Sequence, residues 1–145
     1  MAASALSYAP FGLTSHQMLA TSTVKLAHFE DLRVWQKSRD LSLAVYSASG
    51  DGKFARDPAL RDQVRRAVVS IMSNIAEGFE RYSRTEFRHF LSIARGSAAE
   101  VRSQLHLAHR LGYIPEAEYV ALNESCLEIS RMLAKLRSTL SEPRR

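Results

Sequence analysis

Apolar residues recur at helical spacing over long segments of this chain, and short breaks separate the segments. In residues 119–140 the apolar positions alternate in steps of three and four, which is the spacing of one helix face. Residues 60–79 contain a second run at helical spacing. With 145 residues, 4 Pro and 6 Gly, the chain is long enough for one domain and has few helix breakers. The sequence therefore predicts an all-α fold around a single core.

Helix-end signals locate the first two helices. Acidic residues follow Phe29, where a helix dipole favours them, and a helix is predicted from there to about Ser47. The glycines of residues 49–53 then break it. Asp57 is a preferred N-cap residue and Pro58 fits the first helical position, so a second helix is predicted to begin there.

Two further helices follow after short connections. Ser83 and Glu86 match a capping box that opens a third helix, and Gly112 is a good terminator for it. Pro115 can start a fourth helix. Short loops favour antiparallel neighbours. The prediction is an antiparallel up-down-up-down four-helix bundle over residues 28–141, with no second domain.

The two ends of the chain lie outside this bundle. Residues 1–24 contain no Asp, Glu, Lys or Arg, yet they are too polar to span a bilayer and lack the basic start of a secretory signal. We interpret residues 1–27 as a disordered or dispensable tail and residues 142–145 as a short C-terminal tail. Met18 is an alternative start residue, so residues 1–17 need not be translated.

The excess positive charge is concentrated in the middle of the chain. Residues 53–110 hold eleven Lys or Arg and six Asp or Glu, whereas the two flanking segments are balanced. At 100° per residue, four arginines of the third helix fall within about 40° of one another. This set, the arginine stripe, consists of Arg84, Arg88, Arg95 and Arg102. His106 and His109 extend it, and no acid interrupts it, because Glu86 and Glu100 point well away.

A permanently charged stripe suits phosphate groups, because the planar guanidinium binds phosphate oxygens at two points. The stripe lacks interleaved aromatic residues, so recognition of backbone or shape is expected over sequence reading. Nucleic acid, either RNA or DNA, is the predicted ligand, and an acidic protein partner is a related reading. The alternative is a purely structural assembly in which the same arginines form salt bridges between subunits, without nucleic-acid binding.

Arg65 and Arg66 add two cations from the second helix, and Arg66 lies on a polar face of that helix. The face continues through Ser70, Ser73, Asn74, Glu77 and Arg81. Neighbours four residues apart can exchange hydrogen bonds or form a weak ion pair. A solvated face would account for any one of these residues, but serine and asparagine are poor helix formers. Their joint presence favours an interface or a polar network.

Small residues gather on the third helix away from its apolar face. They are Ser92, Gly96, Ala99 and Ser103. A glycine in a helix interior costs roughly 1 kcal/mol relative to alanine, so Gly96 indicates a close neighbour. That neighbour is either another helix of the bundle or another subunit, unless the glycine is simply tolerated.

Five motifs, in this order along the chain, resemble those of the bacterial four-helix bundle proteins. They are Phe29-Glu-Asp-Leu-Arg-Val-Trp-Gln-Lys37, Gln63-Val-Arg-Arg-Ala67, Ser70-Ile-x-x-Asn-Ile-Ala-Glu-Gly78, Ile93-Ala-Arg-Gly-Ser97 with Glu100, and Leu111-Gly-Tyr-Ile114. That family includes the proteins encoded by intervening sequences in 23S ribosomal RNA genes. It is similar to the accessory proteins of diversity-generating retroelements.

The resemblance implies a cytoplasmic bundle that assembles as a ring-shaped homopentamer and has no known enzymatic activity. For the retroelement relatives it implies binding of RNA and of a reverse transcriptase through a basic surface. It also adds Ser97 and Glu100 to the residues of an interface or polar network. The chain departs from the family pattern before the second helix, where Phe54-Ala55 and Ala59-Leu60 replace a Phe-Pro and a Gly-Leu pair.

Signals for enzyme chemistry are incomplete. Glu86 and His89 have the Glu-x-x-His spacing of di-iron bundles, but such a site needs the motif on two helices and a glutamate from each of the others. Glu77 and Glu80 form an isolated carboxylate pair. No metal, no cofactor and no catalytic residue is therefore expected. Cys126, the only cysteine, lies on the apolar seam and fits a reducing compartment such as the cytoplasm.

Overall fold

The computed structural model describes residues 26–141, so the predicted tails lie outside the described residues except at positions 26 and 27. Four long helices and two short ones make up this part of the chain. In order they are the 3-10 helix η1 (Phe29–Asp31), α2 (Arg33–Ala48), α3 (Gly52–Ala55), α4 (Pro58–Glu80), α5 (Arg84–Arg110) and α6 (Glu116–Thr139). The prediction of an all-α chain with four main helices is confirmed.

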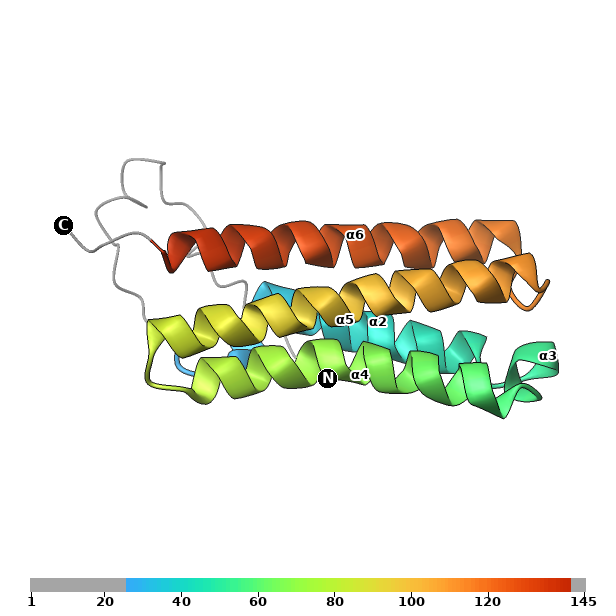
Figure 1. Cartoon of the computed structure of the whole chain (residues 1–145), viewed down its shortest axis with the longest axis horizontal. Helices are drawn as coiled ribbons and strands as arrows, with labels where there is room; N and C mark the ends of the chain where they lie inside the picture. Colours follow the sequence, from blue (N-terminus) through green and yellow to red (C-terminus); the bar gives the residue numbers. More distant parts are fainter. Residues whose placement is uncertain (1–25, 142–145) are drawn as a thin grey trace, which may run out of the picture.

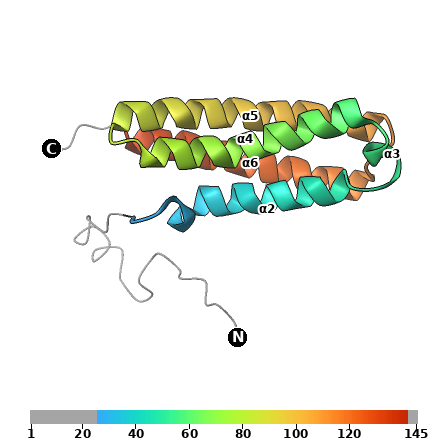
Figure 2. The same cartoon turned by 90° about the horizontal axis from the view of Figure 1, so that it is seen from below.

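The long helices pack side by side as a bundle, and consecutive helices run in opposite directions (Figure 1). α2 packs against α4 and α6, and α5 packs against the same two helices. Figure 2 shows the same arrangement from below, with α3 at the end of the bundle where α2 leads into α4. The turn between α4 and α5 lies at the opposite end.

The first long helix begins later than predicted. Phe29–Asp31 form the separate helix η1, and α2 begins at Arg33 because Leu32 has extended dihedral angles (φ −70°, ψ 121°). The Asp31 carboxylate accepts a hydrogen bond from the His28 backbone N–H at 3.3 Å. The acidic residues therefore lie in η1, and not in the first turn of α2.

A short, unpredicted helix, α3, lies before α4. α3 buries Phe54, whose ring centroid is 5.6 Å from that of Tyr113 in the loop between α5 and α6. The Tyr113 hydroxyl donates to Asp57 Oδ2 at 3.0 Å, and Asp57 Oδ1 accepts the Leu60 N–H at 3.2 Å. Asp57 thus caps α4, as predicted, and also connects the two loops at this end of the bundle.

The ends of α5 follow the predicted signals with one difference. The Ser83 side chain accepts the Glu86 N–H at 3.3 Å, and Gly112 has the positive φ, 76°, of a helix terminator. The Glu86 carboxylate lies 3.7 Å from Arg81 Nη1. An ion pair thus takes the place of the second half of the predicted capping box.

The core runs along the axis of the bundle. Its largest fully buried side chains come from every long helix, and they include Val45, Ile71, Ile75, Leu91, Leu105, Ile129 and Leu133. On α6 the predicted seam is confirmed, because Leu122, Cys126, Ile129 and Leu133 are buried and Tyr119, Leu136 and Leu140 pack at its edge. Within residues 26–141, no helix combines the length and apolar character that crossing a bilayer requires.

Two serines of α2 and the serine that caps its C-terminal end are buried, which the apolar pattern did not predict. The hydroxyls of Ser38, Ser42 and Ser49 donate to carbonyl oxygens four residues earlier, at 2.7, 2.9 and 2.7 Å. Each buried hydroxyl is therefore satisfied within its own helix. The Ser42 hydroxyl also lies 3.4 Å from the Val68 carbonyl oxygen, so these small side chains let α2 approach α4 closely.

Candidate nucleic-acid interface

The arginine stripe lies on the side of α5 that faces α6. At one end, Arg84 Nη2 donates to the backbone carbonyl of Thr139 at 3.0 Å. Towards the other end, Arg102 Nε donates to Asn123 Oδ1 at 3.3 Å. Both acceptors, the Thr139 carbonyl and the Asn123 side chain, belong to α6, and both are neutral. These contacts orient the two arginines without removing their charge.

The two middle arginines of the stripe lack such contacts. Arg88 is half-buried, and its Nε atom is buried without a hydrogen-bond partner within residues 26–141. Arg95 is exposed. The described part of the chain contains six close ion pairs. Arg81 forms two of them, and the others involve Lys37, Arg39, Arg61 and His109. None of the four stripe arginines takes part in them, so the positive charge of the stripe is unneutralised there.

The predicted extension of the stripe through the two histidines is wrong in one respect. His109 Nε2 lies 2.6 Å from the Glu116 carboxylate at the start of α6. The His109 ring also stacks on Tyr119, with centroids 4.5 Å apart and an interplanar angle of 10°. An acid from the neighbouring helix thus interrupts the cationic surface at this end, and this contact depends on how α5 and α6 pack. The unneutralised stripe ends at Arg102.

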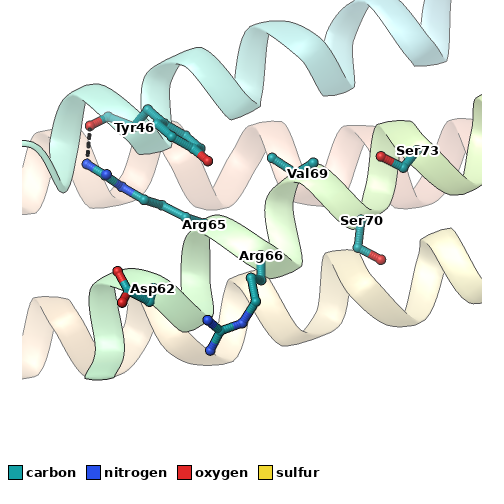
Figure 3. Close-up of a pocket in the computed structure, with 7 residues that line it drawn as sticks. All are labelled: Tyr46, Asp62, Arg65, Arg66, Val69, Ser70 and Ser73. Carbon is teal, nitrogen blue, oxygen red and sulfur yellow. Dashed lines mark hydrogen bonds between the residues drawn. The ribbon is translucent and has the colours of Figure 1, made fainter. Parts of the chain in front are cut away.

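The side chains of Arg65 and Arg66 diverge from α4, with Arg65 directed towards α2 and Arg66 towards α5 (Figure 3). Arg65 reaches the C-terminal end of α2, where its Nε donates to Ser49 Oγ at 2.8 Å and its Nη2 to the Tyr46 carbonyl at 3.3 Å. Its guanidinium carbon also lies 4.5 Å from the centroid of the Tyr46 ring. Arg65 therefore joins α2 to α4 and satisfies carbonyl and hydroxyl groups at a helix end.

Arg66 is exposed and lies between two open hollows. The first, about 500 Å³, is lined from α2 and α4 by Tyr46, Asp62, Arg65, Arg66, Val69, Ser70 and Ser73 (Figure 3). The second, about 550 Å³, is lined from α4 and α5 and contains Glu100 and Gln104 besides Arg66 and Ser70. Arg66 is on a different flank of the bundle from the arginine stripe, because the stripe faces α6.

A polar network links α4 to α5. The Ser70 and Ser97 hydroxyls lie 2.9 Å apart, and Ser97 is buried. Asn74 Nδ2 donates to the Ser70 carbonyl at 2.8 Å and to its hydroxyl at 3.0 Å. Ser70, Asn74 and Ser97 therefore satisfy one another within the subunit.

The remaining residues of the predicted polar face have other roles. Ser73 and Glu77 are exposed, and Glu77 forms an ion pair with Arg81 at 2.8 Å. Glu100 is exposed at the edge of the second hollow. An exposed i,i+4 pair contributes only a few tenths of a kcal/mol. These side chains are thus available to solvent or to a partner.

Two glycines on the α4–α5 pair differ sharply in their surroundings. A Cβ atom on Gly78 would lie 2.6 Å from Phe90 Cβ and 2.9 Å from Phe87 Cδ2, so only glycine allows this approach of the helices. A Cβ atom on Gly96 would meet nothing within 4 Å among the described residues. The predicted close neighbour of Gly96 is therefore no helix of its own bundle. Of the alternatives for Gly96, contact with another subunit and a simply tolerated glycine remain, and within the bundle the close approach occurs at Gly78.

No group of three or more His, Cys, Asp or Glu residues comes together in a metal-binding arrangement within residues 26–141. Glu86 is turned towards Arg81, and His89 is exposed. Burial raises the pKa of the Cys126 thiol to about 12, and the nearby charge of Arg102 partly opposes this shift. Cys126 therefore behaves as a core residue near neutral pH.

A family model for 23S rRNA-intervening sequence proteins matches residues 30–135. This chain belongs to the 23S rRNA-intervening sequence protein family. The match spans the long helices apart from the last residues of α6. The resemblance carried by the five sequence motifs is thereby confirmed.

A solved structure from Bacteroides thetaiotaomicron is similar to this member of the 23S rRNA-intervening sequence family. It is described as a protein with unknown function from the S23 ribosomal protein family. The two chains are 27% identical with a TM-score of 0.66, over 72% of this chain and 97% of the other. Among curated proteins, none matches this chain.

The motifs of this 23S rRNA-intervening sequence protein include positions with clear packing roles. Gly78 allows α4 to approach α5, and Ser70, Asn74 and Ser97 form the polar network between the same two helices. Arg65 joins α4 to α2. The stripe residues Arg84, Arg88 and Arg102, in contrast, lie outside the five motifs.

Proposed function

We propose that this protein is a non-enzymatic, oligomeric, cytoplasmic four-helix bundle that binds nucleic acid along the arginine stripe of α5. The observation that supports this proposal is the absence of any carboxylate partner for the four stripe arginines within residues 26–141. A protein surface normally intersperses its cations with acids. A row of unneutralised arginines along α5 attracts a polyanion.

The geometry of the stripe suits phosphate groups. From Arg84 to Arg102 the stripe follows α5 for about 27 Å, at 1.5 Å per residue. Arg84 and Arg102 are held at its ends by neutral acceptors of α6, so their outer guanidinium nitrogens are oriented before a ligand arrives. Arg88 and Arg95 between them form no ion pair within residues 26–141. Such contacts read the backbone, so RNA and DNA of any sequence are expected to bind.

Assembly is the second part of the proposal. The family resemblance supports a ring-shaped homopentamer, and the bare surface at Gly96 supports contact of the outer α5 face with another subunit. A ring repeats the stripe in every subunit, so weak phosphate binding is strengthened by multivalency. A reverse transcriptase-like protein is a proposed further partner, by analogy with the retroelement accessory proteins.

The competing function is a structural assembly in which the stripe arginines pair with acids of another subunit. The same unpaired arginines favour it, together with the exposed carboxylate of Glu100. The two functions differ in their response to salt. Phosphate binding weakens steeply as the ionic strength rises, whereas an oligomer held by apolar contacts persists.

Light scattering after size exclusion, combined with gel shift on single-stranded RNA, double-stranded RNA and duplex DNA, tests the proposal. The test variant is Arg88→Glu/Arg95→Glu. The control is Lys53→Glu/Arg56→Glu, which makes the same change in charge at exposed positions near α3. The proposal predicts that the test variant keeps its oligomeric mass and loses the shift, while the control keeps both. A test variant that dissociates would support the structural assembly instead.

A further inference from the structure

The turn between α4 and α5 presents an uncovered aromatic ring. Tyr82 has a relative exposure of 108%, whereas the next most exposed large apolar side chain of residues 26–141, Leu43, reaches 65%. Tyr82 is the middle residue of a three-residue connection, so its ring stands clear of both helices. No described part of the chain covers either face of the ring.

The turn that carries Tyr82 is held firmly on both sides. The Arg81 N–H donates to the Gly78 carbonyl at 3.2 Å, and the Ser83 hydroxyl caps α5. The Arg81 guanidinium carbon lies 5.2 Å from the centroid of the Phe90 ring, which packs against Gly78. Because hydrogen bonds fix the flanking backbone, contact of a ligand with the ring costs little backbone conformational entropy.

Tyr82 also lies beside the first residue of the arginine stripe. Arg84 follows it by two positions, and its only described polar contact is the neutral Thr139 carbonyl. On the other side of Tyr82, the carboxylates of Glu77 and Glu86 neutralise the positive charge of Arg81. The unneutralised charge near the ring therefore belongs to Arg84. Figure 1 shows the α4–α5 turn at the end of the bundle where α6 terminates.

A bare aromatic ring next to a row of cations is the arrangement with which proteins bind unpaired nucleotides. Aromatic side chains stack on exposed bases while arginines contact the adjoining phosphates. Bases inside a blunt duplex are stacked on one another and offer no free face to a side chain. We infer that Tyr82 stacks on an unpaired nucleobase of a strand whose phosphates lie on the arginine stripe.

This inference rests on the proposed nucleic-acid function and names its ligand more closely. The site takes single-stranded nucleic acid, or a single-stranded end, in preference to a blunt duplex. Stacking is tolerant of sequence because every base has a flat face, so no base preference is required. Tyr82 adds affinity at one end of the stripe, and the arginines supply the charge along the rest.

Fluorescence anisotropy with a labelled oligouridylate of about 12 nucleotides, within the usual range of site sizes, tests the inference at low salt. A blunt RNA duplex of equal length is the second probe. Tyr82→Ala is expected to weaken binding of the single strand by about five- to a hundredfold and to leave the duplex unaffected. Tyr82→Phe retains the stacking face and should bind like the wild type. Leu43→Ala, which removes an exposed apolar side chain elsewhere, is the control.

Three results would overturn the inference, and they separate its failure from that of the proposed function. Suppose that Tyr82→Ala binds the single strand as tightly as the wild type while Arg88→Glu/Arg95→Glu does not bind. The arginine stripe is then supported as the nucleic-acid site, and base stacking on Tyr82 is wrong. If the wild type binds neither probe, both proposals are wrong. If Tyr82→Ala changes the oligomeric mass in light scattering, Tyr82 is a contact between protein subunits.

Discussion

At the scale of single residues, two glycines of the α4–α5 pair are constrained in opposite ways. A Cβ atom added at Gly78 would lie closer to Phe87 and Phe90 than normal contact allows, whereas one added at Gly96 would meet open space. The sequence could show that both interrupt a helix, because glycine is a poor helix former in either place. It could not show which one touches a neighbour, since that depends on how α4 and α5 pack.

Alanine substitutions at the two glycines should have effects of opposite sign. Gly78→Ala is expected to lower the free energy of unfolding by about 1–3 kcal/mol, because the new methyl group forces Phe87 and Phe90 to move. Gly96→Ala should raise it by about 1 kcal/mol in the isolated subunit, because alanine favours the helix. Urea denaturation followed by circular dichroism measures both. Equal effects at the two positions would contradict the packing described for α4 and α5.

Tyr113 should make the free energy of unfolding depend on pH in the alkaline range. The hydrogen bond to Asp57, assisted by partial burial, raises the pKa of the Tyr113 phenol above its ordinary value. The folded state therefore keeps a proton that the unfolded state releases above about pH 10. This contribution to stability is complete below that pH and is lost as the pH rises through the folded-state pKa.

Tyr113→Phe should remove this part of the pH dependence. In the wild type, the free energy of unfolding is expected to fall more steeply above about pH 10 than in the variant. Urea denaturation at a series of alkaline pH values provides the comparison. An identical slope in Tyr113→Phe would show that the bond to Asp57 does not couple to folding.

Cys126 should report on unfolding by its chemistry. Its thiol is buried on α6, and burial raises the pKa to about 12, so almost no thiolate forms near neutral pH. Iodoacetamide is expected to leave Cys126 unmodified in the native protein and to alkylate it in urea. Mass spectrometry detects the added group. Rapid alkylation without urea would mean that α6 opens readily from the bundle.

At the scale of elements, the sequence predicted the four long helices, because local signals determine them. The four long helices follow from apolar spacing and from caps such as Asp57 and Ser83, which act within one turn. η1 and α3 were missed because each is very short, and α3 is stabilised by burial of Phe54 against Tyr113 of a distant loop. Periodicity also aligned the arginine stripe on α5. Its neighbours on α6, Asn123 and Thr139, depend on how the two helices pack.

The link between α2 and α4 should depend on Arg65 and not on its neighbour. Arg65→Ala removes hydrogen bonds to Ser49 and to the Tyr46 carbonyl, and should cost about 1–3 kcal/mol of unfolding free energy. Arg66→Ala, at an exposed side chain on the same helix, is the matched control and should have little effect on stability. Thermal denaturation compares the two. Equal stability of both variants would rule out a structural role for Arg65.

At the scale of the whole molecule, the residues that pack α4 against α5 and the arginine stripe lie on different flanks of α5. The polar network and Gly78 join α4 to α5 on one flank of α5, and the arginine stripe occupies the flank that faces α6. The sequence predicted the bundle and its family, because these depend on patterns that extend along the chain. It did not predict that Glu116 ends the cationic surface at His109, because that contact joins two helices. Closed assembly is likewise a property of several chains.

The salt dependence of RNA binding tests the central claim, that the arginine stripe of α5 is a phosphate-binding surface, most directly. Four phosphate contacts predict that the logarithm of the single-strand association constant falls with the logarithm of salt concentration with a slope of roughly −3 per site. Arg88→Ala/Arg95→Ala should reduce the magnitude of that slope by about 1.4, while Lys53→Ala/Arg56→Ala leaves it unchanged. A slope that both double variants share with the wild type would place the phosphate contacts elsewhere and contradict the account.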